Sequence, residues 1–353
     1  VQDPQGASLT TVTTYFEDPA LIGSYGKIQS RLNPDGSWAK YEHDSEGRRV
    51  LEARSWLESN IDTPAAQART TYYDYTPVDP ADAQESRDKE QPRTVTETIQ
   101  GNIVGKTYYA YLTNGIGARI EIVERCLDPA AAYGDASNQR TVTTYYPEGT
   151  TTAESGRLNS VLYPDGRFDV YAYEYGTYYP AANPAEPGQF TFGMGNDLRR
   201  TVTHGTATDP AGIAFKTTRE ISVQGSVGNE LLRETLVYDG STYARIDWAV
   251  LEHDEFGRVV STYNSDGTRT DSTWGCCAKE SETNAAGIST TYFYDDLQRV
   301  ERSVRESLGS DIETVYTYDP AGRQLTQTVS AGGLSLQTSN SYDTAGRLIR
   351  TTD

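Results

Sequence analysis

A six-residue pattern, Tyr-Asp-x-x-Gly-Arg, recurs at a fixed spacing and constrains the fold of this chain more than any other feature. Two clear copies begin 24 residues apart, at Tyr318 and Tyr342, and a third begins 24 residues earlier, at Tyr294, with Gln298 in place of glycine. A catalytic motif is normally needed once, so a recurring motif indicates architecture. The residues of these three copies are Tyr294, Asp295, Arg299, Tyr318, Asp319, Gly322, Arg323, Tyr342, Asp343, Gly346 and Arg347.

Two weaker copies lie upstream and have histidine where the others have tyrosine. The segments "WAKYEHDSEGRRV" from Trp38 and "WAVLEHDEFGRVV" from Trp248 agree at eight of thirteen positions. Because each histidine replaces a turn tyrosine, we expect it to stack rather than to transfer protons. The matching residues are His43, Asp44, Gly47 and Arg48 in the first copy, and His253, Asp254, Gly257 and Arg258 in the second.

A longer period lies above the short one. "VTTYF" at Val12 recurs as "VTTYY" at Val142, and the "PDG" at Pro34 recurs at Pro164, both at an offset of 130. We therefore predict one continuous repeat array over 1–353, in which 1–130 and 131–260 are a tandem duplication. The remainder, 261–353, holds the regular 24-residue repeats.

Turn chemistry explains the short unit. Asp accepts hydrogen bonds from backbone amides two residues on, and Gly supplies the positive φ of a tight turn, so we predict positive φ at Gly322 and Gly346 and a distorted copy at Gln298. Runs of five to nine residues rich in Leu, Val, Thr and Tyr separate the turns and are typical of strands. The sequence thus predicts an all-β chain of antiparallel hairpins, paired into one continuous sheet that is wound into a coil, shell or tube.

Charge and hydropathy exclude several classes of partner. The chain has 50 acidic and 31 basic residues, a net charge of -19 that repels nucleic acid and anionic membranes. No apolar run approaches the roughly 18 residues of a membrane span, and no signal peptide is recognisable. Since the chain starts at Val1, we expect a leader or upstream segment to have been removed.

The sequence offers few residues that could form a catalytic or a metal site. Its three histidines and the absence of a Cys-x-x-Cys pattern argue against a zinc site or a Ser-His-Asp set. Paired carboxylates such as Asp295 and Asp296 fall at predicted turns, and turn chemistry explains the acidic "PDG" segments better than loose calcium binding does. We expect no enzyme activity, no cofactor and no metal.

The cysteines leave three alternatives open. Cys126 stands alone and Cys276 is adjacent to Cys277, an odd number that makes no disulfide framework. They are buried small apolar side chains, or Cys126 forms a disulfide with one of the pair, or the two neighbours form a strained link.

Insertions and chain ends carry two further expectations. The segments from Thr76 and from Tyr178 break the short period with Pro, Ala and charge, so we predict protruding loops. The first and last strands fall inside the repeat pattern and should have open edges. Such edges would recruit further repeats of the same chain or identical subunits end to end.

The "YDxxGR" turns resemble the Rhs or YD-repeat family, which includes polymorphic toxins, the cocoon of insecticidal toxin complexes, and teneurins. The resemblance implies a secreted or cell-surface β-shell of hairpins that encloses an effector in the toxins. It implies a non-catalytic structural section of a larger protein, as a toxin shell or a filament. The alternative is a module that binds carbohydrate or a cell surface through its 26 tyrosines or its loops.

Overall fold

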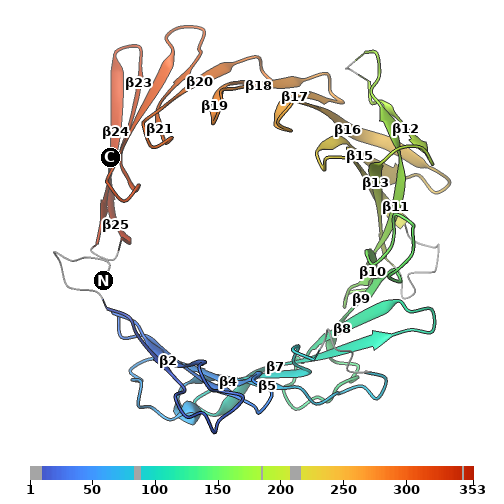
Figure 1. The fold of residues 1–353 in the computed structure, drawn as a ribbon. Coiled ribbons are helices and arrows are strands. Elements are labelled where there is room, and N and C mark those ends of the chain that lie inside the picture. The colour runs from blue at the N-terminus through green and yellow to red at the C-terminus, as the bar shows by residue number, and fades with distance from the viewer. Residues whose placement is uncertain (1–9, 83–88, 184–185, 207–215, 344–345) are drawn as a thin grey trace. The chain divides into compact units, whose positions relative to one another are not determined.

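The chain is almost entirely β-structure, as the sequence predicts. The computed structural model describes residues 10–82, 89–183, 186–206, 216–343 and 346–353. In these residues, 25 strands form one antiparallel sheet, and a single 3-10 turn spans Ala65–Gln67 (Figure 1). No helix of the described residues is long and apolar enough to cross a membrane.

The chain divides into two compact units. The first covers Val1–Tyr171 and His204–Lys216, and the second covers Ala172–Thr203 and Thr217–Asp353. The strands of the first unit are β1 (Val12–Tyr15), β2 (Ile28–Leu32), β3 (Trp38–His43), β4 (Arg49–Arg54), β5 (Arg69–Asp74), β6 (Thr94–Ile99), β7 (Asn102–Thr113), β8 (Arg119–Arg125), β9 (Gln139–Tyr145) and β10 (Leu158–Leu162). The residues of β11 (Arg167–Tyr179) and β13 (Asp197–Thr206) are divided between the units, and the first residue of β14, Lys216, belongs to the first unit.

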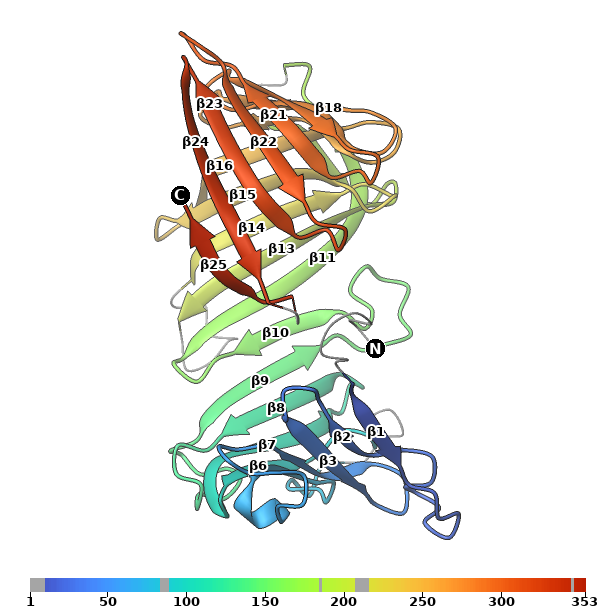
Figure 2. The ribbon, with the colours of Figure 1, turned by 90° about the vertical axis from the view of Figure 1, so that its left-hand side faces the viewer.

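The second unit contains the regular repeats. Its strands are β12 (Gln189–Phe192), β14 (Lys216–Gln224), β15 (Glu230–Tyr238), β16 (Tyr243–His253), β17 (Val259–Asn264), β18 (Arg269–Trp274), β19 (Lys279–Thr283), β20 (Ser289–Tyr294), β21 (Val300–Arg305), β22 (Ile312–Tyr318), β23 (Gln324–Ala331), β24 (Leu334–Tyr342) and β25 (Leu348–Thr352). Consecutive strands from β14 to β25 pair antiparallel, so β21 to β25 lie side by side in chain order (Figure 2). The duplication boundaries at 130 and 260 stay a prediction.

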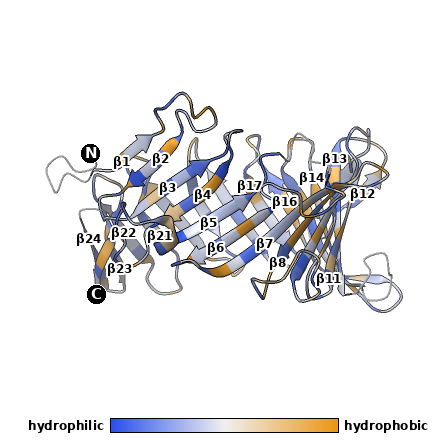
Figure 3. Cartoon of the chain, turned by 90° about the horizontal axis from the view of Figure 1, so that it is seen from below, coloured by the Kyte–Doolittle hydropathy of each residue, from blue (hydrophilic) through white to orange (hydrophobic). Residues whose placement is uncertain are grey.

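The core is thin because most strand residues are only half-buried. One cluster in the first unit joins Trp38, Leu51, Ala53 and Ala68. Another cluster, in the second unit, joins Tyr178, Val223, Leu232 and Val250. Hydrophobic and hydrophilic residues are interleaved along the strands (Figure 3). Polar contacts therefore contribute more to holding the strands of this sheet together than they would in a sheet with a thick apolar core.

The hairpin turns follow the predicted chemistry. Gly322 and Gly346 each have φ 83°, and Gln298 has φ 61°, so this position keeps the turn conformation although it lacks glycine. The strand register shifts directly before the turn, between Thr317 and Tyr318 for instance, which marks a bulge. A three-residue loop that ends in a left-handed residue and a bulge is a common hairpin connection.

The insertion from Thr76 is not simply a protruding loop. Asp82, within it, and Arg93, at its end, are buried in the first unit. Residues 83–88 of this insertion, and 184–185 of the insertion from Tyr178, lie outside the described part of the chain.

Candidate functional site: a turn latch between successive hairpins

All five sequence-predicted copies of the motif form the same turn. In each copy the Asp backbone N–H donates to the carbonyl of the Arg four residues on, as from Asp319 to Arg323 at 2.9 Å. The Asp carboxylate accepts from the backbone N–H and from Nε of that Arg, at 2.9 and 2.6 Å in this copy. The corresponding Asp–Arg pairs are Asp44 with Arg48, Asp254 with Arg258, Asp295 with Arg299, and Asp343 with Arg347.

These bonds keep the turn carboxylates ionised. The hydrogen bond from the side chain of Arg299, followed by that from its backbone amide, lowers the pKa of Asp295 below the ordinary value. At Asp319 the backbone amide of Arg323 is the largest cause of a lowered pKa. Hydrogen bonds to a charged form favour that form, so the turn is most stable when Asp is a carboxylate and Arg is protonated.

The motif tyrosine joins its own hairpin to the preceding one. The Tyr318 hydroxyl donates to the carbonyl of Val300 at 2.8 Å, and the Tyr342 hydroxyl donates to the carbonyl of Gln324 at 2.8 Å. In each case the acceptor directly follows the Arg of the preceding turn. We call this contact between an aromatic donor and the preceding turn the turn latch.

The preceding arginine completes the latch. The guanidinium of Arg299 lies 4.6 Å from the ring centroid of Tyr318, and that of Arg323 lies 5.0 Å from the centroid of Tyr342. Arg299 Nη1 also donates to the carbonyl of Asp319 in the next turn at 3.3 Å. The stacking partner of Tyr318 and of Tyr342 is therefore the arginine of the preceding turn.

Strand register places the latch. Thr326 pairs with Ser339, and the latch joins Gln324, two residues before this pair, to Tyr342, three residues after it. The same offsets hold for the latches of Tyr75, Trp274, Tyr294 and Tyr318, whose acceptors are Arg49, Val259, Lys279 and Val300. Tyr, Asp, Gly and Arg thus recur together because each is needed where one turn meets the next.

The structure reveals a copy that sequence reasoning missed, at Trp274. Trp274 Nε1 donates to the carbonyl of Val259 at 2.9 Å, and Arg258 lies over its ring at 5.3 Å. The turn that follows is one residue shorter, since the Gly275 N–H donates to the carbonyl of Ala278. It lacks both the aspartate and the left-handed glycine, so only its aromatic residue, midway between His253 and Tyr294, could have signalled it.

The insertion from Thr76 contains an Asp–Arg pair, Asp82 with Arg93, whose members are not four residues apart as in the motif but farther apart in the sequence. Arg93 Nε and Nη2 donate to the carboxylate of Asp82 at 2.6 and 3.0 Å, with both side chains almost fully buried. The guanidinium of Arg93 lies 4.6 Å from the ring centroid of Tyr111. This is the Asp, Arg and aromatic set of a latch, but the Asp comes from the inserted loop.

The two histidine copies make no such hydrogen bond to the preceding turn. His43 and His253 stand at the latch register, and Nδ1 of each is buried without a hydrogen-bond partner. Phe16 packs edge-on against His43, with ring centroids 6.0 Å apart. Burial, with the nearby charges of Lys27 and Arg49, lowers the pKa of His43. This histidine is consequently an aromatic packing group that is neutral at pH 7.

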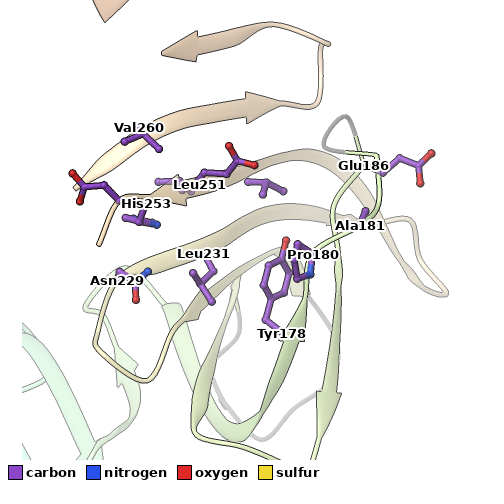
Figure 4. Close-up of a pocket in the computed structure, with 12 residues that line it drawn as sticks. Tyr178, Pro180, Ala181, Glu186, Asn229, Leu231, Leu251, His253 and Val260 are labelled. Atoms are coloured by element: carbon purple, nitrogen blue, oxygen red, sulfur yellow. The ribbon is translucent and has the colours of Figure 1, made fainter. Parts of the chain in front are cut away.

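A cavity of about 590 Å³ lies beside His253 in the second unit (Figure 4). Leu231, Val250 and Leu251 supply apolar walls, while Asn229 and Glu252 supply polar groups. Asn229 ends the preceding turn, at the position that arginine holds in four of the five latched copies. The open space therefore coincides with a missing latch.

The cysteines are separated by environment. Cys126 is buried, and burial raises the pKa of its thiol. Cys276 and Cys277 are both exposed in the short turn after Trp274, with their sulfur atoms 2.7 Å apart. In the described part of the chain, no group of three or more His, Cys, Asp or Glu side chains could hold a metal ion.

Comparisons with known proteins give only distant likenesses. No protein-family model matches the sequence, and no curated protein matches it. Among solved structures, "Crystal Structure of TcdB2-TccC3" is 12% identical, with 98% of this chain and 20% of that chain covered and a TM-score of 0.32. "Structure of Photorhabdus luminescens Tc holotoxin pore, Mutation TccC3-D651A" is 12% identical, with 97% and 24% covered and a TM-score of 0.27. The chain spans about a fifth of the length of these solved chains.

Proposed function

We propose that this chain is a non-catalytic structural section of a larger YD-repeat protein, in which latched hairpins build a continuous wall. The observation that carries the proposal is the turn latch, which joins one hairpin to the preceding one at the same register in five places. Groups that would otherwise suggest chemistry, such as the Asp carboxylates and the Arg guanidinia, are occupied by holding the turns. Their role is to fix strand geometry.

The edges of the sheet support growth of the wall. Among the described residues, β1 pairs only with β2 and β25 pairs only with β24. An exposed strand edge offers backbone donors and acceptors to a further strand. We infer that further repeats of the same protein, or identical subunits, pair there, and that the assembly is secreted or lies at a cell surface and encloses an effector.

Electron microscopy of the full-length natural protein tests this function. The proposal predicts a continuous wall around a lumen, and added protease should cut a segment held in that lumen only after the wall is unfolded. Separate globular particles joined by flexible linkers would contradict it.

A binding module is the second candidate, and the cavity beside His253 favours it. Apolar walls with a few polar groups are typical of small-ligand sites, and a surface glycan would be the ligand. Binding of the purified chain to a glycan array, lost in a Leu231→Arg variant that blocks the cavity, would support this candidate. Failure across the array would leave the structural role alone.

A further inference from the structure

The turn between β18 and β19 holds two adjacent thiols in a fixed frame. The Gly275 N–H donates to the carbonyl of Ala278 at 2.9 Å, so Cys276 and Cys277 are the two loop residues. Arg258 Nη1 donates to the carbonyl of Gly275 at 2.8 Å, and the Tyr294 hydroxyl donates to that of Lys279 at 2.7 Å. Latch contacts from the preceding and the following hairpins therefore hold both sides of the thiol pair.

The two sulfur atoms lie unusually close together. Their separation of 2.7 Å is well inside the roughly 3.5–4.0 Å at which even carbon atoms make optimal non-bonded contact. Both residues are exposed, so a dissolved oxidant reaches them, whereas Cys126 is buried. Cys276 and Cys277 are thus accessible to solvent and adjacent to a second thiol, whereas Cys126 is buried.

We propose that Cys276 and Cys277 are a redox-sensitive vicinal pair, which a small-molecule disulfide such as oxidised glutathione converts into a disulfide that closes the turn. One thiolate attacks a sulfur of the oxidant, forms a mixed disulfide and releases one small thiolate. The neighbouring cysteine thiolate then attacks the protein sulfur of that mixed disulfide, forms the Cys276–Cys277 bond and releases the second. The protein loses two electrons and two protons, and the oxidant is reduced to two thiols.

The bond should be labile rather than a stabilising staple. Consecutive Cα atoms are about 3.8 Å apart, below the usual 4.4–6.8 Å range of disulfides, so the bond is strained and easily reduced. It closes almost no loop and removes little entropy from the unfolded chain. The hydrogen bond between the thiols, the largest cause, raises the pKa of Cys277, so oxidation should be faster at higher pH.

The test treats the reduced full chain with oxidised glutathione and follows it by intact mass and peptide mapping without reduction. We expect a loss of two hydrogens that maps to Cys276 and Cys277, a free Cys126, and full reversal in reduced glutathione. The Cys277→Ser variant should instead keep glutathione on Cys276, and Cys126→Ser should behave as the parent chain.

Other outcomes overturn the proposal. A stable glutathione adduct on the parent chain would show that the second attack does not occur. Covalent dimers through either cysteine, or a link to Cys126, would show that the neighbours are not each other's partners. A bond that resists reduced glutathione would refute the predicted lability.

Discussion

Removal of one hydroxyl from the latch should destabilise the second unit measurably. Tyr318→Phe deletes only the donor that reaches the carbonyl of Val300 at 2.8 Å, and the ring stays under Arg299. An intramolecular hydrogen bond contributes about 0.5–1.5 kcal/mol net. Because Tyr318 is half-buried, water can partly replace the lost donor, so we expect about 1 kcal/mol.

The same strand provides the control. Tyr316 is also half-buried, and among the described residues its hydroxyl has no hydrogen bond in the structure. Tyr316→Phe should therefore stay within about 0.5 kcal/mol of the parent chain. Urea unfolding followed by tryptophan fluorescence measures both, since Trp248 and Trp274 lie in the second unit. Equal midpoints for the two variants would refute the latch as a stabilising contact.

Further predictions concern the turns and the buried pair. Gly322→Val should lower the free energy of unfolding by more than about 1 kcal/mol, because φ 83° strains a β-branched residue although the space around it is open. Gln298→Gly should stabilise the chain by relieving the strain of a non-glycine residue at φ 61°. The melting temperature of each variant relative to the parent chain tests both. Asp295 and Asp319 have lowered pKa values, so their ionised forms contribute stability that is fully present above the unfolded pKa of about 3.9 and is lost as pH falls through the folded pKa. The urea concentration at the unfolding midpoint should therefore decrease when the pH is taken below about 4. An unchanged midpoint at that pH would contradict this. Arg93→Met should cost about 3–5 kcal/mol because it removes one member of a buried ion pair, and adding Asp82→Leu should restore much of that loss. A double variant as unstable as Arg93→Met would contradict this.

The sequence predicts the turns well because their chemistry is local. Asp319 and Arg323 lie four residues apart, so their pairing follows from a short pattern, and the positive φ of Gly322 follows from the turn type. The hairpin sheet follows from repetition of that pattern. The structure forms an Asp–Arg side-chain hydrogen bond at each of the five motif copies.

Contacts between turns were harder to predict because they depend on strand register. The ring of Tyr318 meets Arg299 because the register that pairs Arg302 with Val315 brings the end of β22 beside the turn before β21. Asp82 pairs with Arg93 across an insertion whose path no repeat pattern encodes. Trp274 belongs to a shortened turn that has lost the motif's aspartate and glycine.

A double-mutant cycle between Arg299 and Tyr318 tests most directly the central claim that successive hairpins are coupled through the latch. The cycle compares Arg299→Met, Tyr318→Leu and the double variant by urea unfolding, with Tyr316→Leu in place of Tyr318→Leu as the matched control cycle. A guanidinium 4.6 Å from a ring centroid at a half-buried site predicts a coupling free energy of about 0.5–1 kcal/mol for Arg299 with Tyr318, and none for Arg299 with Tyr316. Additive effects in the first cycle would contradict the claim.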